Sequence, residues 1–416
     1  MVITPAGFQG RFSKRGPEAY GPGSPAPRKR SFLSHITMNK ILGVLLGLTL
    51  GAGGISNNFK AQDDAAIIHV QDYVERIVDS GKCSGIIIGI INEKGRQILS
   101  YGELEKGSGK KPNENTVYGI GSITKLFTCF LLADMANHGE VNLNEPISSF
   151  LPDLIKAPRF DGKEITLYHL ATHTSGLPAR PDNLSPANPD DPYADYSGDQ
   201  LYEFLSKYKL SRKVGLKYEY SNIGVGLLGY ILTQKSGIDY ETLVHKRICE
   251  PLNLSRTIIA VPAKLQSSVA TPYNKEGQSV TDWTFSPVFV GAGSLKSTAH
   301  DMLIFVAANI GLIDARLSST FELTHIKHPG NNIALGWHIW DEFGTIIFGH
   351  SGSSIGYKSF IGFSKKSKSG VIVLSNKTDA VMDIGLHILD HGYQLRDQWV
   401  KNDQAKVARP ASGKNP

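Results

Sequence analysis

Ser122 and Lys125 are the residues whose types and spacing first suggest chemistry. Three residues apart on a helix, a hydroxyl and an amine share one face. A serine hydroxyl is a poor nucleophile at neutral pH, but a lysine in a partly desolvated cleft, with a lowered pKa, can take its proton or stabilise its alkoxide. Residues 108–111 and 206–209 repeat the spacing and are typical of solvated surface. Ser122 differs because it begins an apolar stretch without Gly or Pro, so we expect it at the mouth of a helix.

Tyr220 and Asn222 form a second candidate element, again just before an apolar stretch. A tyrosine near a lysine can exist partly as a phenolate and act as a general base. An asparagine amide can bind a substrate carbonyl or the lysine itself. Taken alone, residues 220–222 are more typical of a helix cap than of a catalytic site.

The triplet His350-Ser351-Gly352 forms a third candidate element, after a strand-like apolar stretch. A strand edge there can supply a backbone N–H to an oxyanion, and its polar side chains can bind a substrate carboxylate. Two Lys-Ser-Gly triplets, at residues 235–237 and 368–370, compete for this role. Both have sufficient structural explanations, one as the glycine end of a helix and the other as a turn before a strand, so we retain the triplet at His350.

The elements that must position these groups follow from hydrophobic periodicity. Apolar residues at helical spacing between residues 67 and 78 predict an opening helix, and the isoleucine-rich residues 85–91 predict a buried strand. Further along we expect a helix over residues 122–135, a mainly helical lobe with long loops at about 141–280, strands at 344–350, 357–363 and 370–375, and a helix from about 379 to 395. Strands near both ends of the chain, with helices between them, predict one sheet closed by both termini, in the α/β class of the α+β type.

In order and context, the three candidate elements resemble the signature of the penicillin-recognising serine hydrolases, which include class C β-lactamases, D-alanyl-D-alanine carboxypeptidases and related esterases. The resemblance runs from about residue 65 to about residue 395 and includes two further segments, residues 170–178 and 291–299. It implies a β-lactamase-like fold, with an antiparallel sheet formed by both chain ends, flanking helices and a mainly helical lobe.

The resemblance also implies a role for each candidate residue. Ser122 would be the acylated nucleophile, Lys125 its partner, Tyr220 the general base and Asn222 a substrate contact. His350, Ser351, Gly352 and Ser353 would line the strand side of the site. The backbone N–H groups of Ser122 and Ser353 would form the oxyanion hole. No cofactor is implied.

The third element of class C β-lactamases has the pattern Lys-Thr-Gly, and the histidine at the first position of the triplet in this chain departs from that pattern. His350 is more similar to the carboxypeptidase, aminopeptidase and esterase branches of the family. We therefore expect a hydrolase of amide or ester bonds in β-lactam or D-alanyl-peptide substrates. A carboxylesterase of the same fold and a non-catalytic penicillin-binding or sensing module are the alternatives.

Other patterns in the chain favour structural explanations. Residues 224–229 match a dinucleotide fingerprint, but no buried strand precedes them, so tight helix packing explains them better. Residues 352–356 match a nucleophile elbow, but a strand follows instead of the required helix. We expect His173 to organise a loop and Cys129 to be a core residue. Cys83, Cys129 and Cys249 allow at most one disulfide, and the histidines show no metal-binding spacing.

Composition and charge exclude several other classes. The chain has 416 residues, 41% of them hydrophobic, which is enough for a substantial core. Residues 1–40 contain seven Lys or Arg and one Glu, which accounts for the whole net charge of +6. The remaining residues balance to zero, so nucleic acid is not an expected partner. The expected partner, a small-molecule or peptide substrate, is implied by the resemblance.

The leader is typical of an exported protein. The apolar run at residues 41–50 is too short to span a membrane, which needs about 20 apolar residues. We expect an unstructured extension at residues 1–37, a signal peptide at 38–62 cleaved near Ala61, a hydrolase domain at 63–398 and a flexible tail at 399–416. The mature protein would then be periplasmic or secreted, without a stable membrane anchor.

Overall fold

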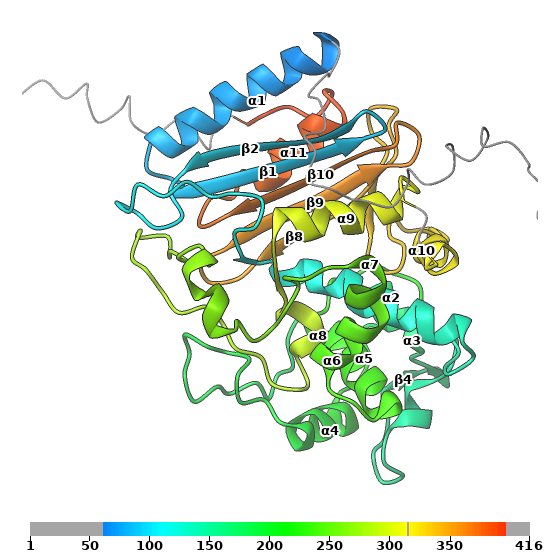
Figure 1. The fold of residues 1–416 in the computed structure, drawn as a ribbon. Coiled ribbons are helices and arrows are strands. Elements are labelled where there is room, and N and C mark those ends of the chain that lie inside the picture. The colour runs from blue at the N-terminus through cyan, green and yellow to red at the C-terminus, as the bar shows by residue number, and fades with distance from the viewer. Residues whose placement is uncertain (1–60, 314–315, 397–416) are drawn as a thin grey trace, which may run out of the picture. The chain divides into compact units, whose positions relative to one another are not determined.

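A six-stranded antiparallel sheet in the order β2-β1-β10-β9-β8-β7 organises the fold (Figure 1). The computed structural model describes residues 61–313 and 316–396. Its strands are β1 (Gly85–Asn92), β2 (Gly95–Gly102), β7 (His338–Trp340), β8 (Ile347–Ser353), β9 (Lys358–Ser364) and β10 (Ser369–Ser375). Because β1 pairs with β10, the predicted sheet built from both ends of the chain is confirmed.

Strand β1 is buried on both faces, which explains its nearly continuous isoleucines. Ile87 belongs to one apolar core, whereas its neighbours Ile86 and Ile88 belong to another. The second core lies under α1 (Ala61–Asp79) and α11 (Val381–Leu389). The first core includes α9 (Ala299–Asn309), which packs on the opposite face of the sheet (Figure 1).

The first core continues into the helices that carry the candidate site. In this part of the chain, the α-helices are α2 (Thr124–Asn137), α3 (Leu167–Ala171), α4 (Gly198–Lys207), α5 (Asn222–Ser236), α6 (Tyr240–Val244), α7 (Glu250–Leu252), α8 (Val290–Gly293) and α10 (Ser318–Thr324). Shorter helical turns are η1 (Gly121–Ile123), η2 (Ile147–Phe150), η3 (His245–Cys249) and η4 (Ala263–Ser268). Two small antiparallel pairs complete the described elements: β3 (Tyr118–Gly119) with β6 (Lys296–Ser297), and β4 (Arg159–Phe160) with β5 (Lys163–Glu164).

The glycines of α5 allow close helix packing, as expected for residues 224–229. A Cβ built on Gly229 would lie 3.0 Å from Gly291 Cα in α8, and one on Gly226 would lie 2.6 Å from the Val288 carbonyl oxygen. Larger side chains would therefore push α8 away from α5. This contact matters for the site because α8 carries the carbonyl group of Ala292.

Several element boundaries differ from the predicted ones. The strand expected at residues 344–350 is β8, which begins at Ile347 because the preceding Gly344 adopts a turn conformation with φ of +91°, and it continues to Ser353. The helix expected to run to residue 395 ends at Leu389, since Asp390 is extended. The short strand β7 was not predicted.

Two competing patterns and the cysteines have the expected structural explanations. Gly237 ends α5 in the left-handed conformation, and Lys368 lies in the turn between β9 and β10. Cys83, Cys129 and Cys249 are buried free thiols.

The predicted extension, residues 38–60 of the predicted signal peptide and the predicted tail lie outside the described residues. Within the part of the chain that is described, no helix has both the length and the apolar character needed to cross a membrane.

Candidate active site

Ser122 lies in the helical turn η1, immediately before α2 and beside the end of β8. Gly121 makes this approach possible: its φ is +50°, and a Cβ built on it would lie 2.7 Å from the backbone nitrogen of Ser353. Only glycine adopts this backbone conformation readily and has no Cβ that would collide with Ser353. The turn therefore holds the Ser122 and Ser353 backbones next to each other.

Lys125 is fully buried in the first turn of α2, and its ammonium contacts Ser122 directly. Lys125 Nζ lies 3.0 Å from Ser122 Oγ and 2.5 Å from the carbonyl oxygen of Ala292. Among the described residues, no carboxylate forms an ion pair with it. Burial lowers the pKa of Lys125 to about 7, because the charged form loses its hydration. Near neutral pH the amine is thus available in its basic form.

Tyr220 donates a hydrogen bond to the same serine oxygen, with 2.8 Å between Tyr220 OH and Ser122 Oγ. Lys125 Nζ lies 5.0 Å from the centre of the tyrosine ring. Burial raises the pKa of Tyr220 to about 12, although its hydrogen bond to Ser122 opposes this. This direction favours the protonated phenol at neutral pH, and the general-base role of Tyr220 stays a prediction.

Residues 220–222 serve both as a helix cap and as part of the site. The Ser221 hydroxyl accepts a hydrogen bond from the Gly224 N–H at 2.9 Å and so caps α5. This cap fixes the start of the helix, and Asn222 follows as its first residue. Asn222 lines a cleft together with Ser122 and Ser353. The structure therefore joins the second candidate element to the first.

The third candidate element lies within β8, where alternate residues face opposite sides. His350 is buried and its ring centre lies 6.3 Å from that of Tyr220. Ser351 and Ser353 are exposed. Gly352 packs against the backbone before the nucleophile turn, because a Cβ there would lie 2.0 Å from the Ile120 carbonyl oxygen. All the predicted site residues except Ser351 thus lie at this junction, and Ser351 faces solvent.

Three histidines lie near Tyr220: His173 and His350 are buried and have rings close to that of Tyr220, whereas the half-buried His338 of β7 lies beside His350. Sequence reasoning missed His338. The His338 and His350 ring centres are 5.0 Å apart, and the His173 ring lies 4.7 Å from that of Tyr220. Burial and the nearby Lys125 lower the pKa of His338 to about 4, and burial holds the pKa values of His173 and His350 well below the usual value. These imidazoles are therefore neutral, and Lys125 is the titrating cation of this group.

His173 also organises its loop, as expected. It adopts a φ of +55°, and its Nδ1 accepts a hydrogen bond from the backbone N–H of Ser221 at 3.1 Å. Its carbonyl oxygen accepts a second bond from Glu219 N–H at 2.8 Å. The histidine therefore holds the strand-like segment that presents Tyr220.

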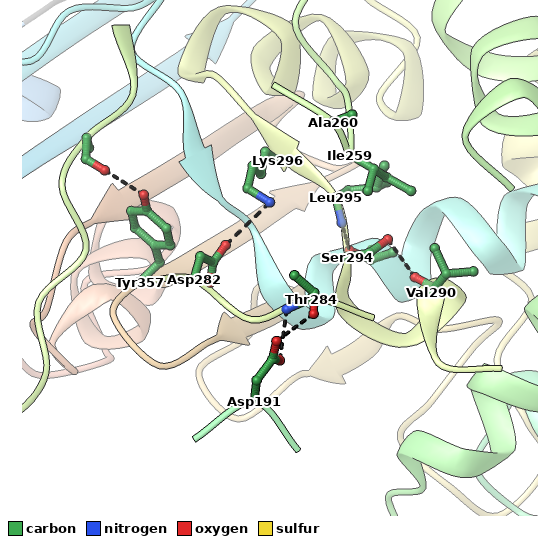
Figure 2. A network of polar contacts seen from close by, with 12 residues as sticks. Asp191, Ile259, Ala260, Asp282, Thr284, Val290, Ser294, Leu295, Lys296 and Tyr357 are labelled. Carbon is green, nitrogen blue, oxygen red and sulfur yellow. Dashed lines mark hydrogen bonds and ion pairs between the residues drawn. The ribbon is translucent and has the colours of Figure 1, made fainter. Parts of the chain in front are cut away.

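Aromatic rings that sequence reasoning did not identify form one wall of the cleft. Its full lining is Ser122, Tyr193, Asn222, Trp283, Phe285, Phe289, Ala292, Gly293 and Ser353. Figure 2 shows how the loop that carries two of these rings is held: Thr284 donates to Asp191, and Asp282 pairs with Lys296 of β6. The rings come from loops without periodicity, so no sequence signal marked them.

No metal centre is indicated in the described ranges, since no group of three or more His, Cys, Asp or Glu side chains there could hold an ion. Cys129 is fully buried, and burial raises the pKa of its thiol to about 12. It is therefore a core residue, as expected, and not a second nucleophile.

The family model described as Beta-lactamase matches residues 70–390, which is most of the chain. The chain belongs to the beta-lactamase family. This assignment confirms the resemblance inferred from the motifs, and it identifies the protein as a serine hydrolase with a β-lactamase-like fold.

Relatives within the beta-lactamase family have two kinds of name. A beta-lactamase of Pseudomonas fluorescens is 25% identical over 351 residues, which cover 74% of this chain and 92% of the relative. The D-alanyl-D-alanine-carboxypeptidase/endopeptidase AmpH of Escherichia coli K12 is 29% identical over 265 residues, which cover 62% of this chain and 67% of the relative.

Solved structures of the family share the fold. A class C beta-lactamase from Rhodobacter sphaeroides has a TM-score of 0.68 at 22% identity and covers 79% of this chain and 99% of its own. A beta-lactamase/D-alanine carboxypeptidase from Pseudomonas syringae has a TM-score of 0.66 at 23% identity, and the match covers 75% of this chain and 94% of the Pseudomonas syringae chain. These likenesses confirm the predicted sheet and helical lobe.

Proposed function

We propose that the protein forms an acyl-enzyme at Ser122 and hydrolyses amide or ester bonds in substrates of the β-lactam or D-alanyl-peptide type. The observation that carries this proposal is the convergence of Lys125 and Tyr220 on Ser122 Oγ, at 3.0 and 2.8 Å. The names of the relatives, beta-lactamase and D-alanyl-D-alanine carboxypeptidase, support the substrate class.

In the acylation step, the neutral amine of Lys125 takes the Ser122 proton as Oγ attacks the substrate carbonyl carbon. The developing oxyanion is stabilised by the backbone N–H groups of Ser122 and Ser353. The bond to the leaving amine or alkoxide then breaks, and the proton passes from Lys125 by way of the Tyr220 hydroxyl to that group. Water repeats the sequence on the acyl-enzyme, which releases the acid and restores Ser122.

Asn222 and His350 take supporting parts in this proposal. Asn222 begins α5 on the cleft, where its amide can bind a carbonyl oxygen of the substrate. His350 is neutral and buried beside Tyr220, so it supplies no charge to a substrate carboxylate. Class C β-lactamases have the pattern Lys-Thr-Gly at this element, with a lysine where this chain has the neutral His350. The neutral side chain favours the carboxypeptidase and esterase branches over a dedicated β-lactamase.

The carboxylesterase alternative follows from the same observation. An ester without a carboxylate needs no cation at the strand side, and a neutral His350 fits such a substrate. A non-catalytic penicillin-binding module would have the same Ser122 geometry but would not release the acyl group.

Mass spectrometry of the purified protein with benzylpenicillin, beside turnover of a 4-nitrophenyl ester, separates these functions. A long-lived adduct supports a peptidase or binding role, and rapid loss of the adduct supports a β-lactamase. No adduct together with fast ester turnover supports an esterase. Ser122→Ala should abolish every one of these reactions, and full activity in that variant would refute the mechanism.

We also propose that the protein is exported and loses its leader near Ala61. The support is the basic start and the short apolar run at residues 41–50. Mass measurement of protein recovered from the periplasm or medium tests this. A mass that includes an intact N-terminus would contradict it.

A further inference from the structure

Phe285 stands between two hollows of very different size. The cleft beside Ser122 holds about 40 Å³, enough for a few waters or a compact acyl group. A second hollow of about 450 Å³ lies along the end of α5 and the start of α6, with Thr233, Ile238, Tyr240 and Pro287 in its lining. Phe285 is the residue that both linings share. Its side chain therefore borders both spaces, and we take its ring as the partition between them.

The ring lies close to the reacting serine. A Cβ built on Gly293 would lie 3.1 Å from the Phe285 ring and 3.9 Å from the carbonyl carbon of Gly121. One small residue thus separates Phe285 from the segment that carries Ser122. An acyl group on Ser122 that extends to this side meets the phenyl ring after a few atoms.

Contacts on both sides hold the partition in place. Phe285 stacks on Tyr193 with ring centres 5.6 Å apart and planes inclined by 7°. The adjacent Trp283 donates from Nε1 to the Asp190 carbonyl oxygen at 2.9 Å. Thr284 N–H donates to Asp191 at 2.9 Å, as Figure 2 shows. Because the ring packs on a buried tyrosine and its loop is tied to residues 190–191, moving it requires several contacts to break.

We propose that Phe285 limits the length of the acyl group that Ser122 accepts, and that the hollow behind it becomes an acyl-binding site when the ring is removed. This inference rests on the proposed function, because it concerns the group that is transferred to Ser122. It makes Phe285 a specificity-determining residue: the intact protein selects compact acyl groups, and a smaller residue at this position admits straight alkyl chains.

A series of 4-nitrophenyl esters tests this inference, with acetate, butyrate and octanoate as substrates and kcat/KM as the readout. In the native protein kcat/KM should fall from acetate to octanoate. In Phe285→Ala the ratio of octanoate to acetate should rise at least tenfold, since each methylene newly buried in the hollow contributes roughly fourfold. Phe285→Leu, which retains more bulk and is easier to accommodate, should give a smaller rise.

The control is Phe343→Ala, which removes the same ring from an exposed position. It should leave the ester ratio unchanged, and thermal melts verify that each variant folds. Equal kcat/KM for all esters in the native protein, or a ratio within twofold of native in both Phe285 variants, would overturn the inference while leaving Ser122 chemistry intact. Ester turnover that persists in Ser122→Ala would instead count against the proposed function. If no ester gave either turnover or an acyl adduct, both the proposed function and the inference about Phe285 would be refuted.

Discussion

The pKa of Lys125 makes the rate of acylation depend on pH in a defined direction. If the neutral amine is the base, the rate follows the neutral fraction, and a pKa of about 7 makes that fraction about one tenth at pH 6 and about nine tenths at pH 8. Between pH 6 and pH 8 the acylation rate should therefore rise about tenfold, and it should level off above pH 8. The rate rises with pH because protonation removes the base.

The surroundings predict a single inflection in this range. His338 has its pKa lowered to about 4, His173 and His350 are held well below the usual value, and Tyr220 has its pKa raised to about 12. None of these groups facing Lys125 should titrate between pH 6 and 8, so the inflection belongs to the lysine.

Quenched-flow mass spectrometry of the acyl-enzyme measures this rate without interference from product release. Lys125→Arg retains a cation but cannot supply a neutral base, so it should lower the acylation rate by about 10²–10⁴ and lose the inflection. His338→Gln is the matched control and should keep the inflection near pH 7. A flat profile, a rate that falls as pH rises, or an inflection that disappears in His338→Gln alone would refute the assignment to Lys125.

Three further predictions follow from the same geometry. Lys125→Met should abolish activity and raise the free energy of unfolding by about 1–4 kcal/mol at pH 6. The reason is that a buried lysine with a depressed pKa in the folded state destabilises the protein fully below pH 7 and less as pH rises toward 10.5. Chemical denaturation at several pH values measures this difference. Tyr220→Phe should keep the native melting temperature within a few degrees but slow acylation by about 10²–10⁴, as stopped-flow assays would show, because the ring packing remains and only the hydroxyl on Ser122 is lost. Gly121→Ala should lower both the melting temperature and kcat, since its Cβ would collide with the Ser353 backbone; unchanged values of both would contradict this contact.

Ser122 and Lys125 were predictable from their spacing together with the apolar stretch that Ser122 begins, since the same spacing at residues 108–111 and 206–209 lacks that setting. The isoleucines of β1 likewise predicted a buried strand. Tyr220 and His350 could be placed beside Ser122 only by the resemblance, since nothing in their own segments specifies a contact across the chain.

What escaped sequence reasoning depends on tertiary structure. Phe285 and Trp283 come from a loop without periodicity, and Ala292 acts through a backbone carbonyl that every residue type possesses. The raised pKa of Tyr220 could not be predicted either, because it comes from the burial that Tyr220 and Lys125 share. Burial is a property of the whole fold and not of a motif.

The pairing of β1 with β10 joins residues about 290 positions apart, as in the contact of Ile86 with Ser375. These two neighbouring strands therefore cannot pair until nearly all of the domain has been synthesised, and closing so long a loop makes folding slow. The chain should consequently lack its sheet while it emerges from the ribosome, and a product truncated before β10 should expose the apolar faces of β1 and aggregate. A late-folding chain of this kind also remains unfolded for longer, which is the state that the export proposed above would require.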